Sequence, residues 1–158
     1  MGYVLLPFVV LMVFAGLIAQ AGQWANTVPG AGITGQLAQR AMNRATQAEA
    51  FAHACLTTAQ QQPGLVADQL TVTLPEGMTP IAGSRCTTVR NGAARLIYAG
   101  VPSLPGAPST LEQMLNGSAF WYRVASVGQA VAIVSGQTIS VPASFAAGTL
   151  LYQGRIEP

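Results

Sequence analysis

The chain has 158 residues, a formal net charge of +2 and only 8% charged residues, whereas an ordinary soluble domain carries about 25%. This length, less an apolar N-terminal segment, allows one domain with a modest core. All seven basic residues are arginines that stand singly between Arg40 and Arg155, and a nucleic-acid-binding surface would need them clustered in a stripe. We therefore expect no nucleic-acid partner.

The N-terminal segment is uncharged from Met1 to Gln39 and almost wholly apolar from Tyr3 to Ala19. Extended as far as Trp24, it reaches the ~20 residues that cross a hydrocarbon core of ~30 Å. We predict a transmembrane anchor over residues 1–24. The residues that we expect to form this membrane anchor include Tyr3, Leu5, Phe8, Val13, Leu17 and Trp24.

A cleaved secretory signal is the alternative for this segment, because Ala19-Gln20-Ala21 matches the small-x-small pattern of a cleavage site. The segment lacks a basic n-region and is longer than a usual h-region of about 7–15 residues, which favours a retained anchor. Either interpretation exports the remaining domain. We expect a single-pass protein of the bacterial inner membrane whose domain lies in the periplasm.

Residues 25–36 have the composition of a Gly/Pro linker, which permits hinge motion. Within this linker, residues 30–35 spell the G-x-G-x-x-G motif of dinucleotide sites, but the strand that should precede the motif is missing. From Leu37 to Gln61 the chain has no Gly or Pro and repeats alanine at spacings of three or four residues. This spacing predicts an amphipathic helix.

After Pro63-Gly64 the period changes, and the alternation of apolar and polar residues from Leu70 to Leu74 predicts a half-buried strand. Further strands are predicted at residues 94–99, 119–127, 130–134, 137–141 and 149–156, joined by tight turns into an antiparallel meander. A capping box from Ser109 to Glu112 predicts a short helix between strands. The fold class is therefore α+β, with the amphipathic helix packed on a mostly antiparallel sheet in a domain of residues 37–158.

The only histidine, His53, lies on the predicted helix one turn after Glu49. A metal site needs three or four converging ligands, and nucleophilic catalysis needs a base with an orienting group. The sequence assembles neither, so we expect no catalytic residue, metal, cofactor or small-molecule substrate. An exported solute-binding module or small enzyme is the alternative, and it predicts a pocket of convergent polar groups near His53 or Trp121.

Cys55 and Cys86 are the only cysteines. In an oxidising compartment they can form a disulfide, and two buried free thiols are the alternative. Strand alternation would place Phe120 and Tyr122 on one face of the sheet and Trp121 on the other. Trp121 is therefore the candidate interface residue, since tryptophan is enriched at interaction hot spots.

The uncharged start MGYVLLPFVVLMVFAGLIAQ, the Ala/Gln-rich second helix and the length of 158 residues resemble the PilM family of type IVb and conjugative thin pili, in an organisation similar to that of pilin-like proteins. This family is distinct from the cytoplasmic actin-like protein that shares its name. The resemblance implies a non-catalytic inner-membrane component of pilus assembly, in the basal body or in pilin transport. It also implies the membrane and other pilus-assembly or secretion-machine proteins as partners.

Overall fold

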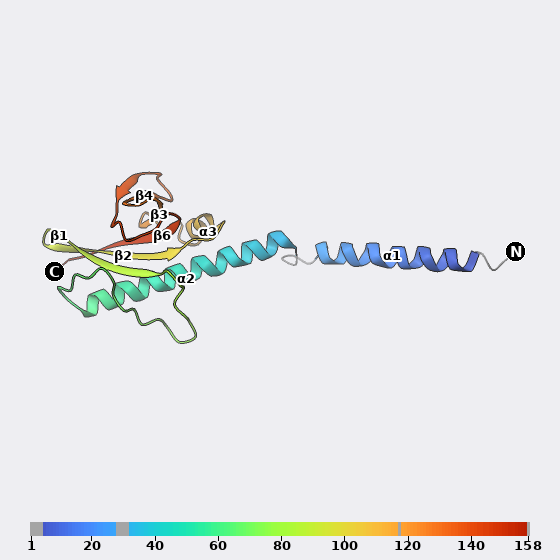
Figure 1. Cartoon of the computed structure of the whole chain (residues 1–158), viewed down its shortest axis with the longest axis horizontal. Helices are drawn as coiled ribbons and strands as arrows, with labels where there is room; N and C mark the ends of the chain where they lie inside the picture. Colours follow the sequence, from blue (N-terminus) through green and yellow to red (C-terminus); the bar gives the residue numbers. More distant parts are fainter. Residues whose placement is uncertain (1–4, 28–31, 117, 158) are drawn as a thin grey trace. The chain divides into compact units, whose positions relative to one another are not determined.

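The computed structural model describes residues 5–27, 32–116 and 118–157, which contain three helices and six strands (Figure 1). The chain divides into two compact units, Met1–Gln39 and Arg40–Pro158, and each is described by itself. The helices are α1 (Leu5–Thr27), α2 (Ile33–Gln61) and α3 (Ala107–Met114). The strands are β1 (Arg85–Asn91), β2 (Ala94–Pro102), β3 (Trp121–Ser126), β4 (Gln129–Ala132), β5 (Thr138–Ser140) and β6 (Thr149–Ile156).

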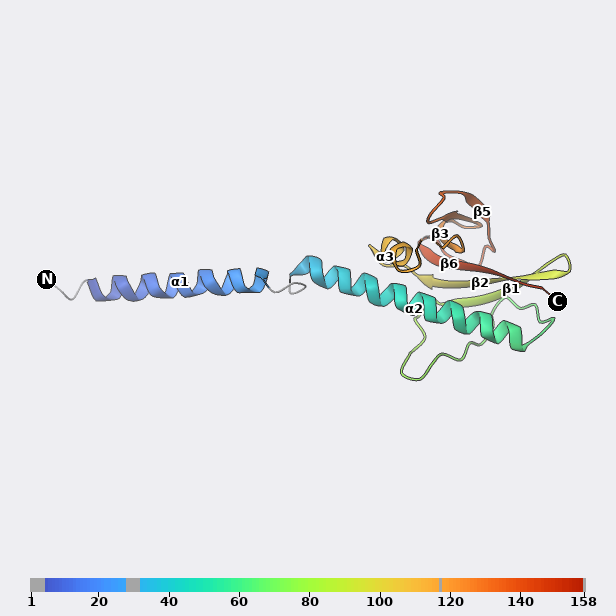
Figure 2. The same cartoon turned by 180° about the vertical axis from the view of Figure 1, so that it is seen from behind.

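The six strands form one antiparallel sheet in the order β1-β2-β6-β3-β4-β5. The predicted α+β domain with a mostly antiparallel sheet is thus present, but the predicted meander is wrong. β6 pairs along its length with β2 and also pairs with β3, so the last strand lies between two earlier ones (Figure 2). A sequence pattern cannot reveal this insertion, because strand alternation reports burial and not neighbours.

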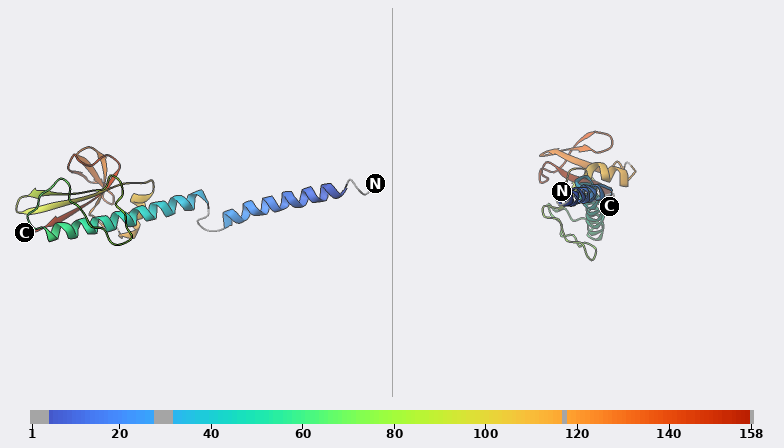
Figure 3. Two further views of the ribbon diagram at one scale, coloured as in Figure 1. Left: turned by 60° about the horizontal axis from the view of Figure 1, so that its bottom comes forward. Right: turned by 90° about the vertical axis from the view of Figure 1, so that its right-hand side faces the viewer.

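One face of the sheet packs against α2 and α3 (Figure 3). Alanine and cysteine recur along α2 every three or four residues, and these small side chains are almost fully buried and allow the helix to lie close to the sheet. They are Ala41, Ala45, Ala48, Ala52, Cys55 and Ala59. From the sheet, Ile97, Ala99 and Val101 of β2 meet them, which follows from the period of two in a strand.

The other face of the sheet carries a second core around Tyr98 and Leu151, covered by Phe145. Gly100 makes this cover possible, because a Cβ atom there would lie 2.6 Å from the Phe145 ring. The sheet is therefore buried on both faces at its centre.

The first unit is dominated by α1, whose large apolar side chains between Val9 and Ile18 are all exposed, from 45% at Val10 to 72% at Ile18. No helix among the described residues is long and apolar enough to cross a membrane. The predicted transmembrane anchor and the single-pass inner-membrane location are therefore contradicted. Within α1 the uninterrupted apolar sequence ends at Ala19, because Gln20 and Gln23 follow before Trp24.

The predicted linker is also shorter than expected. α1 continues to Thr27 and α2 begins at Ile33, so both ends of the predicted range 25–36 are helical. Residues 28–31, including the predicted hinge at Pro29, lie outside the described part of the chain.

Two local predictions fail for identifiable reasons. The segment Leu70–Leu74 belongs to no strand, while the unpredicted β1 is a strand whose residues Cys86, Thr87 and Thr88 are buried consecutively and so break the alternation. The burial of Thr87 is possible because its hydroxyl is satisfied: Thr87 Oγ1 donates to Asp68 O at 2.8 Å. Buried hydroxyls that bond to a neighbouring loop hide a strand from a hydropathy pattern.

The short helix α3 exists, but the predicted capping box is wrong. α3 begins at Ala107, two residues before Ser109, after an N-cap Gly106 that has a positive φ of 83° and no side-chain cap. The Ser109 hydroxyl instead donates to Gly106 O at 2.9 Å. Pro108 at the start favours this earlier beginning, because its fixed φ suits the first turn of a helix.

Candidate interaction surface

The second unit presents an exposed ridge on α2, formed by Glu49 and His53 one helical turn apart. A hollow lies on each side of this ridge. The first, here called the threonine groove, has a volume of about 730 Å³ and is lined by Thr46, Glu49, Ala50, His53, Ala54, Thr57, Thr58, Gln61, Gln62, Thr71, Thr73, Leu74 and Pro75. The second, here called the aromatic hollow, has a volume of about 240 Å³ and is lined by Glu49, Ala52, His53, Leu56, Leu115, Ser118, Phe120, Trp121 and Tyr152.

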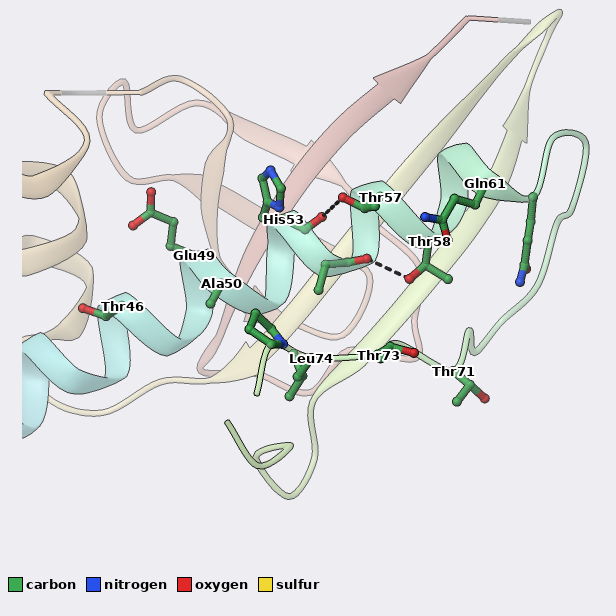
Figure 4. Close-up of a pocket in the computed structure, with 13 residues that line it drawn as sticks. Thr46, Glu49, Ala50, His53, Thr57, Thr58, Gln61, Thr71, Thr73 and Leu74 are labelled. Atoms are coloured by element: carbon green, nitrogen blue, oxygen red, sulfur yellow. Dashed lines mark hydrogen bonds between the residues drawn. The ribbon is translucent and has the colours of Figure 1, made fainter. Parts of the chain in front are cut away.

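The helical wall of the threonine groove carries hydroxyls that are already used as donors. The Thr57 hydroxyl donates to His53 O at 3.0 Å, and the Thr58 hydroxyl donates to Ala54 O at 2.8 Å (Figure 4). Thr46 bonds in the same way to Met42 O at 3.1 Å. The hydroxyl oxygens therefore face the groove as acceptors rather than donors.

The opposite wall of the threonine groove is the extended segment Thr71–Pro75, which Figure 4 shows running alongside α2. This segment is fastened at its start, where Leu70 N–H donates to Cys86 O of β1 at 2.8 Å. Beyond that bond the segment leaves the sheet, and the side chains of Thr71 and Thr73 are exposed. Its apolar members Val72 and Leu74 are half-buried against the core.

The aromatic hollow is built around Tyr152, whose ring centroid lies 5.5 Å from that of Trp121 and 6.4 Å from that of Phe120. Trp121 is 5% exposed and Phe120 is 58% exposed, so the expectation that tryptophan is the outward ring is wrong. The strand begins only at Trp121, and the face of Trp121 is the one that α2 covers. Trp121 contributes to the hollow from the core, while Phe120 is its exposed aromatic residue.

Cys55 of α2 and Cys86 of β1 form a disulfide with a Cα–Cα distance of 5.8 Å. Both residues are almost fully buried, at 0% and 1% exposure. The bond connects the helix that carries the ridge to the edge strand beside the threonine groove. A disulfide of this kind persists in an oxidising compartment.

Arg95 also holds the C-terminal end of α2. The Arg95 guanidinium donates to Gln62 O at 3.0 Å, to Leu65 O at 2.9 Å and to Ala59 O at 3.1 Å. Carbonyls at a helix C-terminus lack partners within the helix and carry partial negative charge, so a cation satisfies both needs. The groove wall on α2 is therefore fixed at its C-terminal end.

The titratable groups of the surface are few. Glu49 forms no ion pair with any described residue, and no three His, Cys, Asp or Glu side chains in the described part of the chain converge on one point. On the far face of the sheet, burial raises the pKa of Tyr98, an effect opposed by the hydrogen bond from Gln153 Nε2 and assisted by Tyr122. Nearer the start of α2, Arg44 has two buried nitrogens, Nε and Nη1, without a hydrogen-bond partner among the described residues.

The residues named for the predicted anchor do not gather into a site. Val13 and Leu17 are each 55% exposed on α1. Leu5, Phe8 and Trp24 also belong to α1, and Tyr3 lies outside the described residues.

Sequence reasoning missed the threonine groove. The available signal was the pair Thr57-Thr58 on α2 together with the alternating Thr71 and Thr73. These four hydroxyls lie on two segments, which the disulfide and the bond from Leu70 bring side by side. No pattern within either segment alone shows that they meet.

The fold of this chain is similar to that of a solved structure. No family model matches the sequence, and no curated protein matches it. The crystal structure of a protein from Escherichia coli B7A, provisionally named PilM, superposes with a TM-score of 0.47 at 16% sequence identity. The match covers 73% of this chain and 92% of that one.

Proposed function

We propose that this protein is a non-catalytic component of pilus assembly that acts by binding other proteins. The observation that carries the proposal is α1, in which the apolar side chains whose burial is described are exposed to between 45% and 72%. A helix that is apolar all round needs a large apolar surface around it, and a contiguous exposed apolar patch marks an interaction site. Partner proteins of an assembly can provide that surface.

The pilus assignment itself rests on the order of the parts. An uncharged apolar helix, then an Ala/Gln-rich helix, then a small β-rich domain resembles the PilM and pilin-like organisation. The ridge on α2 and its two hollows supply further contact surface on the second unit. Their exposed side chains suit recognition, and the disulfide and Arg95 keep the surface rigid.

Gene deletion followed by complementation tests the proposal. The deletion strain should lose pili and pilus-dependent conjugation, and the intact gene should restore both. The double variant Leu11→Gln with Phe14→Gln should fail to restore them, because two exposed contacts become polar. The matched variant Leu11→Met with Phe14→Leu keeps the helix apolar and should complement. Normal piliation in the deletion strain, or full complementation by the glutamine variant, contradicts the proposal.

His53→Ala separates this function from a small enzyme or solute-binding module. His53 is one exposed side chain of a broad contact surface, and most single truncations in an interface cost little, so its loss should leave folding and piliation intact. An enzyme whose base is the only histidine would lose its activity. A folded, disulfide-bonded His53→Ala protein that fails to complement would therefore contradict the non-catalytic assignment.

A further inference from the structure

We propose that the threonine groove binds an extended polypeptide segment of a partner protein, which pairs with Thr71–Leu74 as an added β-strand. This inference names a contact and a class of partner, and it does not depend on the pilus assignment. Strand addition to an exposed edge is a recurrent mode of peptide recognition, in which main-chain hydrogen bonds provide affinity.

Residues 70–74 have the side-chain pattern of a strand but no strand partner in the described part of the chain. Leu70 is 7% exposed and Val72 and Leu74 are half-buried, whereas Thr71 and Thr73 are exposed, which is the period-two alternation of a strand. Yet the backbone groups of Thr71–Leu74 form no hydrogen bond to any described residue. The segment therefore has the side-chain arrangement of a strand and an unoccupied main-chain edge.

The main-chain edge of Thr71–Leu74 has a direction that follows from the bond at Leu70. In an extended chain, successive residues point their N–H and C=O groups to opposite sides. Leu70 N–H points to Cys86 of β1, so in an extended segment the groups of Thr71 and Thr73 lie on the side opposite to that bond. Two N–H and two C=O groups are thus placed on the free side of the segment, the number that a short antiparallel partner can use.

The threonine groove has the size of an extended peptide. Its helical wall extends from Thr46 to Gln61, and 16 residues of helix span about 24 Å. An extended peptide of about seven residues has this length, since each residue advances ~3.3 Å. The volume of about 730 Å³ is also within the range of about 300–1,000 Å³ that is usual for ligand sites.

Charge and polarity define the partner further. Threonine, glutamine and alanine side chains line most of the groove, and Glu49 and His53 are its only titratable residues. Glu49 has no ion-pair partner within the described chain. The complementary segment is an extended sequence of β-branched and hydroxyl-bearing residues with one lysine or arginine beside Glu49 and no acidic residue.

Affinity selection with a random heptapeptide library displayed on phage, against the full disulfide-bonded chain, tests this inference. Enriched peptides should be β-branched with one basic residue, and their binding should slow hydrogen exchange at the amides of Thr71 and Thr73. Thr73→Pro removes one outward N–H and should weaken binding at least tenfold. Thr73→Val keeps the N–H and should change affinity less than threefold. Glu49→Gln should weaken basic peptides by several-fold.

A peptide-side control makes the result independent of how well the proline variant folds. The best selected peptide is synthesised in two versions, with N-methyl groups at its odd-numbered or at its even-numbered residues, so that each version loses the N–H donors on one edge. One of the two versions should bind the unmodified protein at least tenfold more weakly than the parent peptide. Equal binding of both N-methylated versions would overturn the inference. So would exchange at Thr71 and Thr73 that the peptide does not change, enrichment of helix-forming peptides, or a library that yields no enriched sequence.

Discussion

The two long helices of this chain differ in composition, since α1 is apolar along most of its length and α2 alternates small with polar residues, and they bury their apolar residues in opposite ways. α2 buries a stripe of alanines that are each less than 5% exposed and turns Glu49 and His53 outward; the alanines of the stripe are Ala41, Ala45, Ala48, Ala52 and Ala59. α1 has no such division, and its described apolar side chains are exposed on every side. The comparison shows that helical spacing of small residues builds a core only where the opposite face is polar.

The stability of the two helices accordingly has different origins. α2 is held within its own unit by packing, by the Cys55–Cys86 disulfide and by Arg95 at its C-terminus. Neither α1 nor α2 has an acidic residue in its first turn or a basic residue in its last turn, so such charges stabilise neither helix dipole. Most helical stability in proteins comes from packing of one face, so α1 draws its stability from whatever covers it.

Removal of the disulfide should produce the largest effect, because it removes the covalent bond between α2 and the sheet. The double variant Cys55→Ala with Cys86→Ala, across a sequence separation of 31 residues, should lower the free energy of unfolding by ~3–4 kcal/mol, chiefly because the unfolded chain gains freedom. Urea unfolding followed by tryptophan fluorescence measures the change. A loss below about 1 kcal/mol would show that packing alone holds α2.

Matched alanine substitutions on the two helices sharpen the comparison. Ala48→Leu should lower the free energy of unfolding by ~1–3 kcal/mol, because Ala48 is 0% exposed against the sheet and the core has no room for extra methylenes. Ala15→Leu on α1 should change it by less than ~0.5 kcal/mol, since Ala15 is exposed and leucine is also a good helix former. Thermal and urea unfolding of both variants test this, and equal effects would contradict the difference in burial.

The third and smallest effect concerns the end of α2. Arg95→Ala should lower the free energy of unfolding by about 1–2 kcal/mol, because three carbonyls lose a charged donor. Arg95→Lys keeps the charge without the planar fork and should recover part of the loss. Hydrogen exchange at the last turn of α2 would report the same order, and unchanged exchange in Arg95→Ala would show that the contacts are not stabilising.

The sequence predicted elements well where one face of a segment is buried. The strand predicted at Thr149–Ile156 matches β6 at both ends, and the alanine spacing located α2 to its last residue, Gln61. Leu70–Leu74 shows the limit of this reasoning, because the same alternation that marks a strand arises wherever an extended chain lies on a core. Pairing depends on a neighbour, and the sequence pattern of one segment does not contain it.

The candidate surface was less predictable for the same reason. His53 and Glu49 were found on one face of a helix, but the groove beside them is closed by Thr71 and Thr73, which are distant in sequence. Trp121 was assigned to the wrong side because a single residue of register decides which face it occupies. The predicted anchor failed on length, since counting past Gln20 to Trp24 included polar residues in an apolar span.

The position of β6 has a consequence for synthesis. Its residues form the seam between β1-β2 on one side and β3-β4-β5 on the other, so the two halves of the sheet are joined through residues 149–156. While the ribosome has not yet released those residues, the emerging chain has a β1-β2 hairpin and a three-stranded β3-β4-β5 fragment, each with an open edge beside which β6 will later lie. Such edges attract other strands, so the nascent chain passes through an interval in which it needs shielding from its neighbours.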